Sequence, residues 1–68
     1  MKQISGKDFI KILERNGWKL SRIKGSHYIY EKSGHEEIIS VPIHGNKPLR
    51  TGLLLHLMKI AGLSERDI

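Results

Sequence analysis

The sequence predicts an α+β fold with the order α-β-β-β-α, in which two helices pack on one face of a three-stranded antiparallel sheet. Three observations predict this fold. Apolar residues recur at helical spacing near both ends of the chain, the middle of the chain alternates with a period of two, and turn residues separate these segments. A chain of 68 residues has room for one modest core. We therefore expect residues 1–68 to form a single domain.

The first predicted helix begins after Ser5, a residue type favoured as an N-cap. Asp8 places a carboxylate in the first turn, where the helix dipole favours negative charge. Asn16-Gly17 is typical of a helix end in the left-handed conformation. The core-facing stripe at i, i+3, i+4 spacing consists of Phe9, Ile12 and Leu13.

The middle of the chain predicts a three-stranded meander. Residues 18–31 are typical of a hairpin with a turn at Gly25-Ser26, and residues 38–41 form a third strand that Pro42 ends or confines to an edge. The predicted core face holds Trp18, Leu20, Ile29, Ile39 and Val41. The predicted opposite face holds Lys19, Ser21, Tyr28, Tyr30 and Ser40. Strand parity places His27 with Ile29 on the core side, unless the adjacent turn leaves it at the rim.

The last third of the chain predicts a loop and a second helix. Residues 44–48 have a loop composition, Thr51 is the expected helix cap, and Gly62 is the expected helix end. Ser64 to Asp67 repeats a capping pattern and predicts a final helical turn. The buried stripe of the second helix is expected to be Leu53, Leu54, Leu57, Ile60 and Ala61.

Composition narrows the classes of function. Twelve Lys and Arg residues against seven Asp and Glu residues give a formal charge of +5, which favours a polyanionic partner such as nucleic acid. The length excludes Rossmann enzymes, barrels and P-loop ATPases. The absence of cysteine excludes disulfides and thiolate zinc sites. No apolar run approaches the length of a membrane span and no export signal begins the chain, so we expect a soluble cytoplasmic protein.

Four histidines are the residues best suited to chemistry near neutral pH, because an imidazole has an unperturbed pKa of about 6.5. His27 is a candidate general base, the alternative being a polar residue at a strand end. His44 is a candidate helper as an acid or phosphate contact, or it organises its loop. His35 and His56 are expected to be exposed bystanders. The long, irregular intervals between these histidines predict no metal site.

Basic and aromatic residues surround these histidines. Arg22 and Lys24 lie close to His27 in the sequence and are candidate phosphate contacts. Lys47 and Arg50 flank the start of the second helix and either bind phosphate or form a solvated edge. Ser26 either donates a hydrogen bond to phosphate or serves only the turn. The aromatic pair on the second strand either stacks on bases or packs across strands; its members are Tyr28 and Tyr30.

Two motifs carry a resemblance to a known family. Gly25-Ser26-His27 enters a strand, and Val41-Pro42-Ile43-His44-Gly45 precedes an amphipathic helix. With this order of elements the sequence resembles the HicA-type toxins, small messenger-RNA endoribonucleases of toxin–antitoxin modules. The resemblance covers the chain from Ile4 to Leu63. It implies a fold like the double-stranded-RNA-binding domain, and His27 matches the family's catalytic histidine.

The resemblance also implies RNA cleavage without a metal or other cofactor, and a HicB-type antitoxin as partner. We therefore expect a metal-independent endoribonuclease that acts on mRNA, is monomeric when free, and does not bind membranes. Two alternatives remain open at this point. One is a non-catalytic RNA-binding module of the same fold, and the other is a protein-interaction domain whose charge serves solubility.

Overall fold

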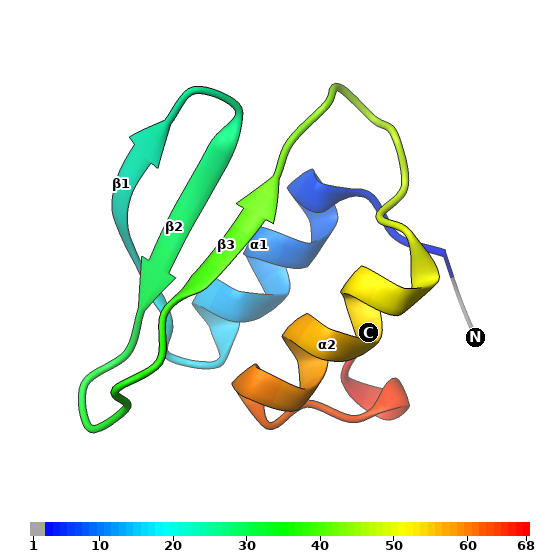
Figure 1. Cartoon of the computed structure of the whole chain (residues 1–68). Coiled ribbons are helices and arrows are strands. Elements are labelled where there is room, and N and C mark those ends of the chain that lie inside the picture. The colour runs from blue at the N-terminus through cyan, green and yellow to red at the C-terminus, as the bar shows by residue number, and fades with distance from the viewer. Residues whose placement is uncertain (1–2) are drawn as a thin grey trace.

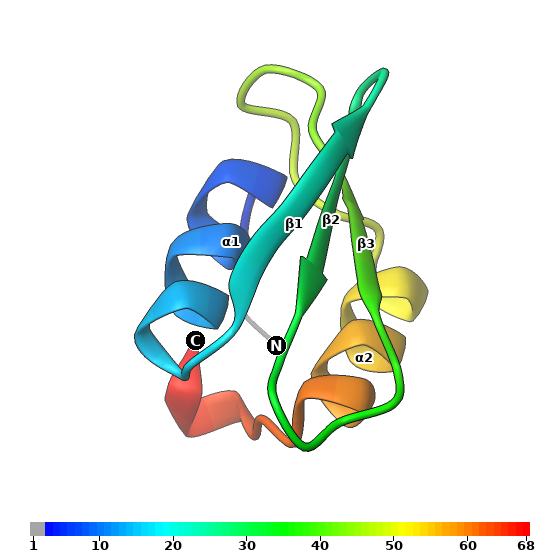
Figure 2. The ribbon, with the colours of Figure 1, turned by 90° about the vertical axis from the view of Figure 1, so that its left-hand side faces the viewer.

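The computed structural model describes residues 3–68, and its elements follow the predicted order (Figure 1). The three strands form one antiparallel sheet in the order β1-β2-β3. Both helices lie on the same side of this sheet, behind it in Figure 2. The predicted α-β-β-β-α fold is thus confirmed. The elements are α1 (Gly6–Arg15), β1 (Lys19–Lys24), β2 (His27–Glu31), β3 (Ile39–Pro42), α2 (Thr51–Ala61) and the 3-10 helix η1 (Glu65–Asp67).

The predicted start and end of α1 are confirmed by local hydrogen bonds and backbone angles. The side chain of Ser5 accepts a hydrogen bond from the backbone N–H of Asp8 at 3.1 Å, which satisfies one donor of the first turn. After α1 the chain passes through Gly17, whose φ of 92° is a conformation that suits glycine.

Capping residues also mark the ends of α2 and η1, but the predicted N-cap of α2 was wrong. Arg50, not Thr51, is the N-cap of α2, and its side chain makes no capping hydrogen bond. Gly62 ends α2 in the left-handed conformation, as predicted. The predicted last turn is η1, and Ser64 and Asp67 form its capping box. Hydrogen bonds from the backbone and then the side chain of Ser64 lower the pKa of the Asp67 carboxyl.

The core lies between the helices and the inner face of the sheet. Side chains from α1, β2, β3 and α2 meet there, and Trp18 packs with them from the segment before β1. The burial of this apolar surface is the main force that holds the helices on the sheet. The buried cluster consists of Ile4, Phe9, Ile12, Leu13, Trp18, Tyr30, Ile39, Val41, Leu49, Leu54, Leu57, Met58 and Ala61.

Strand pairing shows that the predicted faces of β2 were wrong. Tyr30 pairs with Ile39 and Tyr28 pairs with Val41, and directly paired side chains share one face of a sheet. Ile39 and Val41 belong to the buried cluster, so both tyrosines face the helices. Ile29 therefore lies on the outer face, where neighbouring strands on both sides leave it 7% exposed. Apolar residues occupy both faces of β2, and alternation alone does not decide which face is inside.

The predicted burial of Leu20 was also wrong. Leu20 pairs with Tyr30 and Arg22 pairs with Ile29, so a β-bulge at Ser21 inserts one extra residue into β1. Leu20 lies on the helix side of the sheet, yet it is 44% exposed. The helices make their main contacts with the sheet at β3, and β1 is the edge strand on the far side of β2.

The start of α1 packs tightly against the end of β3. A Cβ atom added to Gly6 would lie 2.5 Å from the carbonyl oxygen of Pro42 and 2.8 Å from the side chain of Ile43. The N–H of Leu49 donates to the carbonyl of Ile4 at 2.8 Å, which ties the loop before α2 to the same place. Within residues 3–68, no helix has the length and apolar character needed to cross a membrane.

Replacing Gly6 with alanine tests this close contact. Because the neighbour is backbone and moves only with β3, we expect Gly6→Ala to lower the free energy of unfolding by about 1–3 kcal/mol. Urea denaturation, monitored by circular dichroism, measures this change in the free energy of unfolding. Gly52→Ala is the matched control, since nothing lies within 4 Å of its added Cβ. That control should be neutral or stabilising by up to about 1 kcal/mol, and an equal loss in both variants would contradict the packing.

Replacing Tyr30 with phenylalanine tests its buried hydroxyl, which donates to the carboxylate of Glu14 at 2.8 Å. Burial, and then the hydrogen bond and charge of Glu14, raises the pKa of the Tyr30 phenol. The neutral phenol therefore contributes to the free energy of unfolding below pH about 10, the ordinary tyrosine pKa. This contribution is lost as the pH rises above that value. We expect Tyr30→Phe to lower the free energy of unfolding by about 1 kcal/mol at pH 7. Between pH 7 and alkaline pH, the variant should lose less stability than the wild type does.

Thermal unfolding between pH 7 and pH 11 checks both parts of this expectation, with Tyr28→Phe as the control. Tyr28 is only half-buried, so its variant should keep the alkaline loss of the wild type. An unchanged alkaline transition in Tyr30→Phe would mean that the Tyr30 phenol ionises as freely in the folded protein as in the unfolded one.

Candidate functional site

His27 is the first residue of β2 and is exposed on the outer face of the sheet. Its Nδ1 atom lies 3.2 Å from the Oγ atom of Ser40 on β3, within hydrogen-bond distance. Ser40 sits opposite Ile29 in the register, two residues before Pro42, the partner of His27, and therefore on the same face. This contact holds one ring nitrogen and leaves Nε2 with no hydrogen bond to any residue of 3–68. An imidazole fixed in this way has one nitrogen free to exchange a proton with a ligand.

A row of cations runs along β1 beside His27. Lys24 pairs directly with His27, and Arg22 pairs with Ile29, so both basic residues start from the outer face of the sheet. Lys19 continues the row opposite Glu31 at the far end of the strand. Every residue of β1 is exposed. The structure thus places the predicted phosphate contacts of β1 on the same face as the candidate base.

The turn before His27 is joined to the loop that follows β3. Gly25 has a φ of 61°, and the carbonyl of Ser26 accepts a hydrogen bond from the N–H of Ile43 at 2.8 Å. Both views place this turn and the loop at the same end of the molecule (Figures 1 and 2). This hydrogen bond fixes the backbone next to His27 at this end of the molecule.

The loop after β3 brings three further predicted site residues into one pocket. His44, Lys47 and Arg50 line a cavity of about 370 Å³. Its apolar lining consists of Pro42, Pro48, Leu49 and Leu53. Pro42 is also the strand partner of His27, so the pocket borders the outer-face site at that residue. His27 itself is not part of the lining. The predicted site residues therefore form two adjacent groups, one on the sheet and one in the loop.

The two tyrosines do not belong to this face. Tyr30 is 1% exposed and its hydroxyl donates a hydrogen bond to Glu14, so of the two alternatives for Tyr30 the structure favours packing within the fold over stacking on bases. Tyr28 is half-buried and packs against the core from the helix side. Both tyrosines pack within the fold. The strand register that points His27 outward points Tyr28 and Tyr30 toward the helices.

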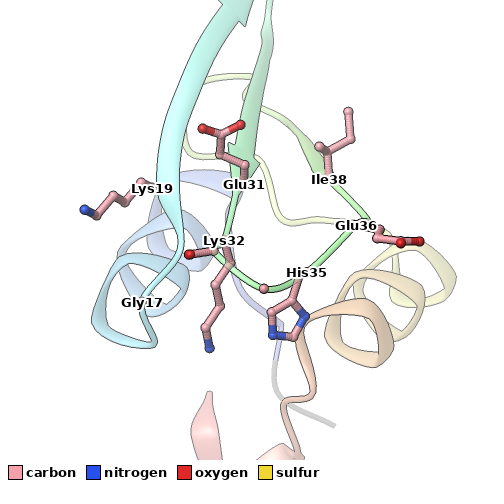
Figure 3. A pocket seen from close by; sticks show the side chains of 9 residues that line it. Gly17, Lys19, Glu31, Lys32, His35, Glu36 and Ile38 are labelled. Carbon is pink, nitrogen blue, oxygen red and sulfur yellow. The ribbon is translucent and has the colours of Figure 1, made fainter.

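The other two histidines are exposed, as predicted. His56 is on α2. His35 is in the hairpin between β2 and β3, and its ring centroid is 5.3 Å from that of Trp18, a contact that the sequence analysis missed. It lines a cavity of about 550 Å³ with Lys32 and Glu36 (Figure 3). Within residues 3–68, no three His, Asp or Glu side chains gather in a way that would hold a metal ion.

Fold and site together define a small basic α+β domain with an exposed histidine beside a row of cations. The sequence matches the family described as "HicA toxin of bacterial toxin-antitoxin" over residues 6–63, and the chain belongs to this family. A solved structure titled "HicA3 and HicB3 toxin-antitoxin complex" is similar, with 32% sequence identity and a TM-score of 0.66. The match covers 87% of this chain and 94% of that one. A comparison with curated proteins gave no match.

Replacing Ser40 with alanine tests how His27 is held. If the 3.2 Å contact fixes the ring, Ser40→Ala should change the tautomer ratio of His27 and broaden its rotamer distribution. Long-range proton–nitrogen correlation spectra of the imidazole measure both effects. Ser33→Ala, in the exposed hairpin at the other end of the sheet, is the control and should leave the His27 signals in place. Identical His27 spectra in wild type and Ser40→Ala would show that the contact does not position the ring.

Proposed function

We propose that this HicA-family protein is a toxin that cleaves mRNA without a metal, with His27 as the general base. The observation that carries the proposal is the exposed imidazole of His27, held through Nδ1 by Ser40 beside the cations of β1. Family membership supports the class of activity. The fold places an imidazole and positive charge on one face, which supports the proposal because transesterification of RNA needs a base, a proton donor and positive charge near the phosphate.

The proposed chemistry starts at Nε2 of His27. With the Nδ1 proton donated to Ser40 Oγ, the lone pair of Nε2 takes the proton of a ribose 2′-hydroxyl. The 2′-oxygen attacks the adjacent phosphorus, and the bond from phosphorus to the 5′-oxygen breaks. The departing 5′-oxygen takes up a proton from a general acid. The products are a 2′,3′-cyclic phosphate and a free 5′-hydroxyl, so no metal-bound water enters the balance.

The surrounding residues have supporting roles in this proposal. Arg22 and Lys24 bind phosphate oxygens on the outer face and stabilise the charge that develops at phosphorus. Lys47 and Arg50 bind a neighbouring phosphate at the loop pocket. His44 shares this pocket and is the candidate acid, while Ser26 aims the turn and is a further candidate donor to phosphate.

The proposed partner is a HicB-type antitoxin that covers His27 or the basic face. The similar solved structure is by its title a complex of a HicA protein with a HicB protein. A net charge of +5 would favour an acidic surface on that partner. In this proposal residues 1–68 form one domain that is monomeric and cytoplasmic when free.

Cleavage of a long RNA in the presence of EDTA tests the proposal. We expect the wild-type protein to cut the RNA with EDTA present, and His27→Ala to be slower by about 10²–10⁴-fold, the usual worth of a positioned base. His56→Ala is the matched control, because it removes an exposed histidine from α2 and should leave the rate unchanged. Thermal unfolding of all three proteins checks that the two variants are as stable as the wild type.

Two outcomes would contradict the proposal. Undiminished cleavage by His27→Ala would remove this residue from the mechanism, and loss of wild-type cleavage in EDTA would reject the metal-free reaction. Salt-sensitive binding that leaves the RNA intact would favour the second candidate, a non-catalytic RNA-binding module, for which the exposed row of cations on β1 is also suited.

A further inference from the structure

The outer edge of β1 has no strand partner among residues 3–68. β1 is the first strand of the sheet and pairs only with β2, and all six of its residues are exposed. Backbone N–H and C=O groups on the free side of an edge strand remain available to another strand. At six residues this edge is about 20 Å long. It offers a strand-sized docking site.

The two faces of β1 have opposite character. The outer face carries the cations Lys19, Arg22 and Lys24, which pair with outward-facing residues of β2. The helix side carries Leu20 and Ile23, which are 44% and 52% exposed because the helices pack mainly on β3. The bulge at Ser21 keeps this division in spite of the extra residue. β1 is therefore a bare edge with a basic face and an apolar face.

We propose that an extended acidic segment of a partner protein adds to β1 as a fourth strand. Its acidic side chains lie beside the cations of the outer face, and its alternate apolar side chains cover Leu20 and Ile23. Main-chain hydrogen bonds supply affinity in such strand addition, and the alternating side chains supply specificity. The partner segment needs about six residues with acidic and apolar residues in alternation.

Charge and apolar exposure favour this occupant over two others. A second copy of the chain, joined through its own β1, would place cations opposite cations, which is destabilising. An RNA strand would satisfy Arg22 and Lys24 but leave Leu20 and Ile23 in water. An acidic, alternating protein strand satisfies the backbone edge, the cations and the aliphatic side chains together.

Strand addition at β1 has a consequence that rests on the proposed function. The acidic side chains would neutralise Arg22 and Lys24, the residues proposed to hold RNA phosphates. An antitoxin bound in this way lowers the affinity of the toxin for RNA without contacting His27.

A peptide titration tests the docking directly and uses no RNA, so a toxin without cleavage activity would not change its outcome. The probe is a capped peptide of six to eight residues that alternates Glu and Val, added to the ¹⁵N-labelled protein. We expect shift changes and slowed hydrogen exchange in the amides of β1 that point away from β2. A peptide that alternates Lys and Val should bind at least tenfold more weakly.

Leu20→Glu should weaken binding of the Glu-Val peptide at least tenfold, since it places an acid on the apolar face. Leu55→Glu is the matched control: Leu55 is exposed to a similar extent, at 48%, but lies on α2. Binding should survive that change. Three results would overturn the proposal: unprotected β1 amides at millimolar peptide, equal binding by Leu20→Glu and wild type, or loss of binding in Leu55→Glu alone.

Discussion

The register between β2 and β3 is the constraint on which the rest of the molecule depends. Tyr30 lies opposite Ile39 and Tyr28 opposite Val41, and this set of side chains packs against the helices. Because side chains alternate along a strand, the residues between them must point outward. His27 is therefore exposed and within reach of Ser40. A shift of the strand register by one residue would point the His27 side chain toward the core.

The pairing of β2 with its neighbouring strands also decides which face of the sheet carries the basic residues. Pairing with β2 places Lys24 beside His27 and Arg22 one step further along, so the basic residues of β1 share the histidine's face. The link between Ser26 and Ile43 holds the loop at the same end, where Lys47 and Arg50 line a pocket bordered by Pro42. A small α+β domain thus presents a histidine beside two sets of cations, which is the arrangement that the proposed cleavage of RNA requires.

The sequence predicts most features that are decided within a few residues, the N-cap of α2 at Arg50 being an exception. The Ser5 cap, the Gly17 and Gly62 helix ends and the final capped turn depend on local hydrogen bonds and backbone angles. The faces of β2 depend on partners far along the chain. Both sets of alternating residues in His27–Glu31 include apolar or aromatic members, so only the position of the helices decides which set is buried. The exposure of Leu20 likewise requires knowledge that β1 is the uncovered edge, and the contact between His27 and Ser40 requires the register of two strands.

The fate of the ribose 2′-oxygen is the most direct measure of the proposed reaction path, because His27 can act as the base only if this oxygen attacks phosphorus. An RNA with one strong cut site can be compared with the same RNA carrying a 2′-deoxynucleotide on the 5′ side of that bond. The proposed reaction predicts that the natural RNA yields a 2′,3′-cyclic phosphate and that the deoxy-substituted bond stays intact. Cleavage of the substituted bond at an equal rate, or a product ending in a free 3′-hydroxyl, would contradict attack by the 2′-oxygen and with it the role of His27.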